Sequence, residues 1–214
     1  NLIHEVIFTD EAIVPEDDFT SHSRYEIKLR VPAEAQSGRI IISDAAEMPN
    51  WIYSDEELTV ALPAVEKVLD LTGAKPGQTV EIKGTNFDLV TKVTMPNDDE
   101  VEFTVKGNVL TFVLPANVTD GTVCIIPASG VKVAAATIGV AVPEEVVAEP
   151  AADLWGGDAI KFKGVNMELV TTVFFPGTAE PVEPTSKSAT EIALTIPEGL
   201  TSGEAVLATA SGAE

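Results

Sequence analysis

The chain has 214 residues, of which 34 are acidic and 13 are basic, so its formal net charge is −21. This charge argues against a nucleic-acid partner and against docking on anionic membranes, because both depend on Lys and Arg. The single cysteine, Cys124, excludes an intrachain disulfide and a cysteine-based zinc site. No apolar run approaches the ~18 residues of a transmembrane helix, so the sequence predicts no membrane insertion within these residues.

Short segments in which apolar and polar residues alternate recur along the whole chain. In chain order they include residues 25–31 (YEIKLRV), 80–84 (VEIKG), 160–164 (IKFKG) and 191–196 (EIALTI). A period of two indicates strands with one buried and one solvated face. Turn pairs such as Asp-Gly and Ser-Gly separate them, and no segment has a sustained helical period. The pattern predicts an all-β chain built from small sandwiches.

An internal repeat divides the chain. Residues 77–96 match residues 157–176 at an offset of 80 without a gap, and nine positions are identical. A second block, in which Pro and Gly lie six residues apart, occurs three times, beginning at Val31, Leu114 and Ile196. The chain is therefore interpreted as three copies of one module.

We expect module boundaries at residues 1–62, 63–142 and 143–214. The first module lacks the counterpart of the strand and turn that open the other two, and the third stops before the counterpart of residues 136–143. We interpret the chain as a piece of a longer protein. The predicted linkers, 61–68 and 141–150, are short, acidic and contain proline, which favours an extended rod of modules.

The repeated motif resembles the IPT/TIG immunoglobulin-like domain. The positions that carry the resemblance in the second module are Gly77, Val80, Ile82, Gly84, Asn86, Phe87, Val93, Met95, Leu110, Phe112, Leu114, Pro115, Gly121, Val123 and Ile125. The third module repeats the pattern, with Met167 where the family usually has Phe or Leu. Tandem acidic modules of this kind are similar to the Ig-like repeats of cell-surface glycan-binding lipoproteins of Bacteroidetes. The resemblance implies a non-catalytic spacer or binding region of a polysaccharide-capture protein, outside the cell on the bacterial outer membrane.

Two other functions remain open from the sequence. One is an adhesive stalk that binds a surface protein, for instance by strand addition. The other is an accessory region of a secreted polysaccharide-active enzyme whose catalytic domain lies outside these residues. Immunoglobulin-like folds occur in all three classes of protein, so the fold does not distinguish them.

No catalytic set or cofactor site is predicted. His4 and His22 are the only histidines, and carboxylates are scattered. The acidic turns 15–18 and 96–100 do not match a calcium-binding loop and are interpreted as solvated turns, with calcium as the alternative. We therefore expect no metal site.

Aromatic residues provide the candidate ligand-binding site. Trp51 and Tyr53 lie in a connection that is three residues longer than its counterpart in the second module, and Trp155 precedes a predicted strand. Aromatic faces stack on sugar rings, so these three residues are the candidate contacts for a neutral polysaccharide. Packing between modules is the alternative interpretation.

Two structural expectations follow from the repeat. The G-x-N turns at 84–86 and 164–166 are expected to place glycine at a positive φ, with Phe87 and Met167 behind them as core residues. Cys124 aligns with Ile41 and Val206, and is therefore expected to be buried and unreactive.

Overall fold

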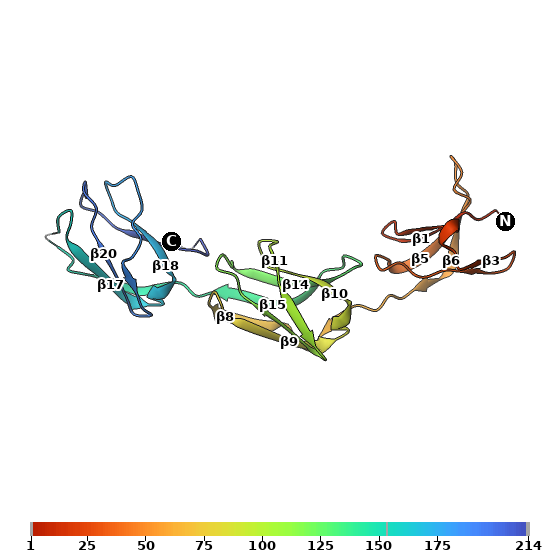
Figure 1. Cartoon of the computed structure of the whole chain (residues 1–214), viewed down its shortest axis with the longest axis horizontal. Coiled ribbons are helices and arrows are strands. Elements are labelled where there is room, and N and C mark those ends of the chain that lie inside the picture. The colour runs from red at the N-terminus through yellow and green to blue at the C-terminus, as the bar shows by residue number, and fades with distance from the viewer. Residues whose placement is uncertain (1, 153, 213–214) are drawn as a thin grey trace.

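The computed structural model describes residues 2–152 and 154–212, and within them the chain is almost entirely β-structure. Figure 1 shows three bodies in an extended row, with β1 in the body at one end and β20 in the body at the other. The predicted all-β fold of immunoglobulin-like sandwiches in a rod is confirmed. None of the described residues belongs to a helix with the length and apolar composition needed to cross a membrane.

The first module combines a four-stranded sheet, ordered β2-β1-β5-β6, with the two-stranded sheet β3-β4. The strands are β1 (Glu5–Thr9), β2 (Ile13–Pro15), β3 (Ser21–His22), β4 (Ile27–Lys28), β5 (Gln36–Ser43) and β6 (Trp51–Leu58), with the 3-10 turn η1 (Glu16–Asp18). Val6, Phe8 and Val14 form its core together with Ala35, and Ile27 and Leu29 pack against them.

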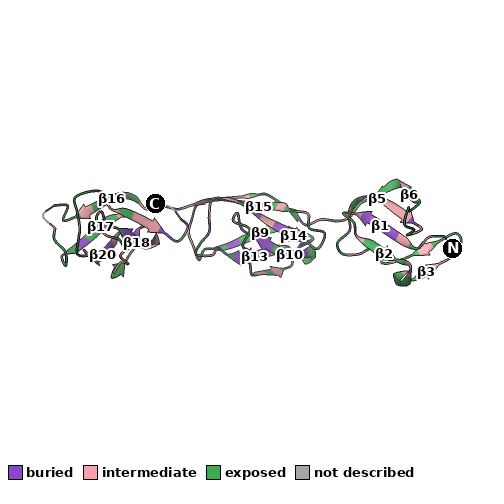
Figure 2. Ribbon diagram, turned by 90° about the horizontal axis from the view of Figure 1, so that it is seen from above, coloured by how far each residue is buried: buried purple, intermediate pink, exposed green. Residues whose placement is uncertain are grey.

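The second module has a five-stranded sheet, ordered β11-β10-β14-β15-β8, and a four-stranded sheet, ordered β12-β13-β9-β7. The elements are β7 (Ala64–Val65), β8 (Leu69–Ala74), β9 (Thr79–Thr85), η2 (Phe87–Leu89), β10 (Val90–Thr94), β11 (Glu100–Val101), β12 (Phe103–Lys106), β13 (Val109–Val113), β14 (Gly121–Pro127) and β15 (Val133–Val140). Neighbouring strands run antiparallel except β8, which pairs with β15 in parallel. Figure 2 colours the buried positions of these strands purple, and their side chains form one hydrophobic core.

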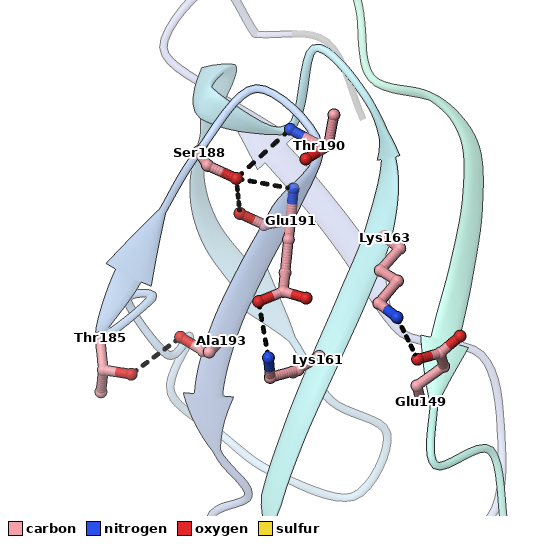
Figure 3. A network of polar contacts seen from close by, with 8 residues as sticks. All are labelled: Glu149, Lys161, Lys163, Thr185, Ser188, Thr190, Glu191 and Ala193. Carbon is pink, nitrogen blue, oxygen red and sulfur yellow. Dashed lines mark hydrogen bonds and ion pairs between the residues drawn. The ribbon is translucent and has the colours of Figure 1, made fainter.

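The third module repeats this plan with fewer strands among the described residues. Its sheets are ordered β16-β17-β20-β19 and β18-β21. The elements are β16 (Glu144–Glu149), β17 (Ala159–Val165), η3 (Met167–Leu169), β18 (Val170–Phe174), β19 (Ser186–Lys187), β20 (Glu191–Thr195) and β21 (Val206–Thr209). Figure 3 shows ion pairs on the solvent face of the larger sheet, where Lys161 pairs with Glu191 and Lys163 pairs with Glu149. The hydrogen bond from Lys163 to Glu149 raises the pKa of the lysine.

The predicted linkers are corrected by the structure. Residues 61–68 contain β7, which pairs with β9, and residues 141–150 contain β16, which pairs with β17. Both strands lie at sheet edges. An edge strand has water along one of its sides, so it tolerates charged residues and an imperfect alternation of apolar and polar residues. The stretches without strand structure are therefore shorter, at residues 59–63 and 141–143.

The G-x-N turns differ from the prediction at the glycine. The residues with positive φ are Asn86, at 57°, and Asn166, at 56°, whereas Gly84 and Gly164 are not among the positive-φ residues. Glycine is required for another reason. A Cβ atom on Gly84 would overlap the carbonyl oxygen of Ala64, and one on Gly164 would lie 2.6 Å from the carbonyl oxygen of Glu144. The absence of a side chain at these glycines therefore allows β7 to lie against β9 and β16 to lie against β17.

Each asparagine of the turns binds the chain just before its module. Asn86 Nδ2 donates to the carbonyl oxygen of Leu62, and Asn166 Nδ2 donates to that of Val142, both at 3.0 Å. The two acceptors are 80 residues apart, as are the two asparagines. The repeated asparagine thus fixes the path of the chain into each module. The expectation that Phe87 and Met167 lie in the core behind these turns is confirmed, since both are buried.

The expectation that Cys124 is buried is wrong. The core residues of β14 are Val123 and Ile125, and Cys124 between them points to the opposite face, where it is half-buried. Its counterparts Ile41 and Val206 also lie on outer faces, being half-buried and exposed respectively. The alignment identified equivalent positions correctly, but apolar residues occupy both faces of these strands, so an apolar residue at the position does not show that it faces the core.

Polar side chains make contacts between neighbouring modules. Gln36 Nε2 donates to the carbonyl oxygen of Ser129 at 2.9 Å, which joins the first module to the second. Lys75 Nζ lies 2.7 Å from Glu168 Oε1, which joins the second to the third. The hydrogen bond from Lys75 lowers the pKa of the Glu168 carboxyl group, so this contact is made by the ionised carboxylate.

The contact between Lys75 and Glu168 should make the junction sensitive to acid. The pair lowers the pKa of Glu168, so it stabilises the junction fully at pH values above 4.5, the ordinary pKa of a glutamate. This stabilisation is lost as the pH falls through the lowered pKa of Glu168. Small-angle X-ray scattering should show greater freedom between the modules at pH 3 than at pH 7. Glu168→Gln should show that freedom already at pH 7, whereas Lys132→Ala, which breaks an ion pair within the second module, should not.

Candidate functional site

Trp51 and Tyr53 lie close together on the first module. Both belong to β6, an edge strand of the larger sheet, and alternate residues of a strand point to the same face. Each is 51% exposed. The loop between β5 and β6 projects beyond the rest of the first module (Figure 1). Trp51 is the first residue of β6, so the two aromatic residues lie where this loop joins the strand.

The strand register places Tyr53 at the end of an apolar row that crosses the whole sheet. Tyr53 lies opposite Ile41 on β5, Ile41 opposite Ile7 on β1, and Ile7 opposite Ile13 on β2. Directly opposed residues have their side chains on the same face. This face is the outer one, because the core residues Val6, Phe8 and Val14 occupy the alternating positions. We call the four residues Ile13, Ile7, Ile41 and Tyr53 the apolar row.

A second row runs beside it and ends at Trp51. Trp51 lies opposite Ser43, Ser43 opposite Glu5, and Glu5 opposite Pro15. Ser43 is buried, and its hydroxyl donates to Glu5 Oε1 at 2.7 Å while accepting a hydrogen bond from the backbone of Ala45. The outer face therefore presents an aromatic edge, an aliphatic strip and a carboxylate held in place by a neighbouring hydroxyl.

The loop before Trp51 is held by its own hydrogen bonds. Asp44 Oδ1 accepts from the backbone N–H of Asn50 at 3.0 Å, and the Asn50 side chain donates to the other carboxylate oxygen. The side-chain hydrogen bond from Asn50 lowers the pKa of the Asp44 carboxyl group. An ionised Asp44 thus ties the two ends of the loop together, and this fixes the start of β6 at Trp51.

The corresponding face of the second module has a different character. The positions equivalent to the apolar row are Glu100, Thr94, Cys124 and Ala134, which are paired in the same way. They combine a charged, a polar and two small side chains and include no aromatic residue. The outer face of the first module is therefore chemically distinct from that of its own repeat. The sequence predicts Trp51 and Tyr53 as candidate contacts but does not single out the three isoleucines, because only the strand register brings them into one row.

Trp155 lies in a separate place. It belongs to the third module, at the opposite end of the row from the first (Figure 1), and is 78% exposed. Its backbone N–H donates to Asp158 Oδ2 at 2.8 Å. It lines a cavity of about 650 Å³ together with Leu154, Phe162, Glu198 and Leu200, among others. The structure therefore brings Trp51 and Tyr53 together but does not bring Trp155 to them.

The acidic turns use their carboxylates in local contacts. Glu16 binds His4 Nδ1 through one oxygen and His22 Nδ1 through the other, and these hydrogen bonds lower the pKa of its carboxyl group. Asp98 pairs with Lys132, and Asp99 accepts from two asparagine side chains. Within residues 2–152 and 154–212, no group of three or more His, Cys, Asp or Glu side chains could hold a metal ion.

The similarities of the chain to known proteins are with solved structures. No protein-family model matches the chain, and no curated protein is significantly similar to it. Among solved structures, it is similar to SGBP-B of a mixed-linkage glucan utilization locus of Bacteroides ovatus, in complex with a mixed-linkage heptasaccharide. The identity is 21%, with a TM-score of 0.33 and coverage of 99% of this chain and 55% of that one.

Two further solved structures show likenesses at the same level. The surface glycan-binding protein SGBP-B of Prevotella bryantii is 19% identical, with a TM-score of 0.34 and coverage of 72% of this chain and 41% of that one. The I9-I11 tandem of titin is 16% identical, with a TM-score of 0.35 and coverage of 89% and 77%. The chain thus spans about half the length of the surface glycan-binding proteins that it matches.

Proposed function

We propose that this chain is a non-catalytic region of a cell-surface protein that captures polysaccharide. Its modules are IPT/TIG-type immunoglobulin-like domains that span residues 1–62, 63–142 and 143–214, although residues 1 and 214 lie outside the described residues. They act together as a spacer on the bacterial outer surface. The first module also binds a neutral glycan on its outer face, through Trp51 and Tyr53.

The observation that carries the proposal is the outer face of the first module. Half-exposed Tyr53 continues an aliphatic strip across four paired strands, and the neighbouring row carries half-exposed Trp51 and the carboxylate of Glu5. The faces of sugar rings stack on aromatic side chains, and their hydroxyl groups bind polar neighbours such as Glu5. With strands about 4.8 Å apart, the row is roughly 14 Å wide, which suits an extended ligand better than a single ring.

The charge of the chain selects among glycans. With 34 acidic and 13 basic residues, the chain repels polyanions, so neutral polysaccharides are the expected ligands. Stacking needs no metal ion, so chelators should not affect binding. Trp155, in the third module, is a separate candidate contact for a glycan and is not part of the site formed by Trp51 and Tyr53.

Affinity electrophoresis in gels that contain neutral polysaccharides tests the proposal. Trp51→Ala should weaken retardation several-fold, since an aromatic contact contributes on the order of 1 kcal/mol beyond its burial. Tyr53→Ala should act in the same direction. Met48→Ala is the matched control, because Met48 is exposed on the preceding loop but lies outside the two rows.

The outcomes separate the parts of the proposal. If the unchanged chain is retarded and Trp51→Ala is retarded equally, the glycan site lies elsewhere, and Trp155→Ala is the next variant to compare. If no gel retards the unchanged chain, the binding part is wrong and the modules act as spacers alone. Loss of retardation in the presence of a chelator would contradict a metal-free stacking contact.

A further inference from the structure

The third module carries an exposed aromatic side chain at a position of the apolar row. Phe174, the last residue of β18, aligns with Ile7 of the first module. It lies opposite Val206 on β21, just as Ile7 lies opposite Ile41. Phe174 is 43% exposed and Val206 is 41% exposed. The outer face of the third module therefore repeats the middle of the apolar row, with an aromatic ring in place of an isoleucine.

The exposure of Phe174 belongs to the face of a sheet and not to an open edge. On one side β18 pairs with β21, and on the other side Val173 and Val182 exchange two backbone hydrogen bonds of 2.8 Å. Both neighbours of β18 thus lie within the described residues. Val173 is buried, and Phe174, which follows it, points to the opposite face because side chains alternate along a strand.

The neighbours of Phe174 give this face the composition of a sugar-binding surface. The antiparallel bridge at Val182 places the exposed Pro181 beside Phe174. We call Pro181, Phe174 and Val206 the Phe174 row. Thr172 lies two residues before Phe174 on the same face and is half-buried. Sugar rings stack on an aromatic face, and their hydroxyl groups bind polar side chains such as that of Thr172.

The second module presents different chemistry at these positions. Thr94, at the position of Phe174, is buried, and Cys124 opposite it is half-buried. Beside them Lys92 forms an ion pair with Glu100. Small side chains and an ion pair thus replace the ring on which a sugar could stack. The aromatic outer faces are therefore those of the first and third modules, in the bodies at the two ends of the row in Figure 1.

We propose that the outer face of the third module is a second binding site for the neutral polysaccharide, with Phe174 as its stacking residue. This inference rests on the proposed glycan binding by the first module. The site is distinct from that of Trp155, because the cavity beside Trp155 is lined by the buried Phe175, whereas Phe174 faces outward. A gel that contains many polysaccharide chains can engage both modules at once, so each contact multiplies the retention supplied by the other.

Affinity electrophoresis in gels that contain a neutral glucan, mannan, xylan or galactan tests this site. In the gel that retards the unchanged chain most, Phe174→Ala should weaken retardation about fivefold, the effect of losing one aromatic contact. Phe174→Tyr keeps a ring and should be retarded like the unchanged chain. The double variant Trp51→Ala and Phe174→Ala should lose retardation. Val165→Ala is the matched control, because Val165 is 44% exposed on β17, in the other sheet of the third module.

Isothermal titration calorimetry counts the sites. With a short oligosaccharide prepared from the polysaccharide that gives the strongest retardation, the unchanged chain should bind two molecules and Phe174→Ala should bind one. The melting transition of the third module should move little in Phe174→Ala, because the side chain is half-exposed. An unchanged transition shows that the variant is folded and that its weaker binding comes from the lost ring.

The outcomes separate this inference from the proposed function. If Trp51→Ala weakens retardation and Phe174→Ala does not, the second site is wrong, while the glycan site of the first module stands. If Phe174→Ala alone weakens retardation, the third module binds the glycan and the site at Trp51 is wrong. Equal losses in Phe174→Ala and Val165→Ala would contradict a stacking contact at Phe174. Absence of retardation of the unchanged chain in every gel overturns both proposals.

Discussion

Replacing Gly84 with valine should lower the melting temperature of the second module well below that of the unchanged chain. The added Cβ would overlap the carbonyl oxygen of Ala64 and lie 2.5 Å from Cζ of Phe87. The carbonyl belongs to β7, which is paired with β9 at this point, so it cannot move away without breaking the ladder. Overpacking of this kind costs about 1–3 kcal/mol of unfolding free energy. Each kcal/mol corresponds to roughly 4–8 °C for a module of this size.

Two variants separate the causes of this effect. Gly139→Ala is the matched control, because its Cβ would meet its nearest neighbour at an ordinary 3.6 Å, and its melting temperature should be unchanged. The double variant Gly84→Ala and Phe87→Met removes the obstacle of the aromatic ring but leaves the carbonyl of Ala64. We expect little recovery relative to Gly84→Ala alone. Full recovery would show that the ring, and not the approach of β7, requires glycine at this position.

Phe87→Ala should destabilise the second module still more. Phe87 is 2% exposed and belongs to the largest of the three cores. Removing a buried phenyl ring costs about 3–5 kcal/mol, since transfer energy is lost and a cavity remains. Calorimetry of the full chain should show one melting transition displaced downwards, because the cores of the other modules contain none of the residues around Phe87.

The repeat supplies its own control for this prediction. Met167 fills the equivalent place in the third module and is buried there. Phe87→Met should therefore cost less than about 1.5 kcal/mol, as is usual for apolar replacements of similar volume. Val113→Ala, at a half-exposed position of β13, should have a smaller effect than Phe87→Ala. If Phe87→Ala and Val113→Ala destabilise the module equally, Phe87 does not hold the two sheets together.

The repeat made the fold predictable because it showed the same alternation in independent copies. Alternation in residues 80–84 and 160–164 identified β9 and β17, and the residues after the G-x-N turns were correctly placed in the core. The conformation of the turns was predicted less well. The positive φ lies at Asn86, since asparagine tolerates this region, while the neighbouring glycine is needed for a contact with a strand 20 residues earlier.

The candidate site was predictable only in its aromatic residues. Trp51 and Tyr53 are rare residue types in a polar context, so the sequence alone draws attention to them. Ile7 and Ile41 resemble core residues, because alternation does not say which face is buried when both faces carry apolar side chains. The same ambiguity led to the wrong placement of Cys124. Strand register, which depends on pairing between distant segments, decides both cases.

The parallel pairing of β8 with β15 has a mechanical consequence. β8 lies near the beginning of the second module and β15 is its last strand, and their ladder runs from Leu69 opposite Ala136 to Ala74 opposite Val140. A tensile force along the rod would pull these two strands in opposite directions along their length. Because the hydrogen bonds lie across that direction, they would bear the load together instead of opening one after another. The arrangement of this ladder therefore favours resistance of the second module to stretching.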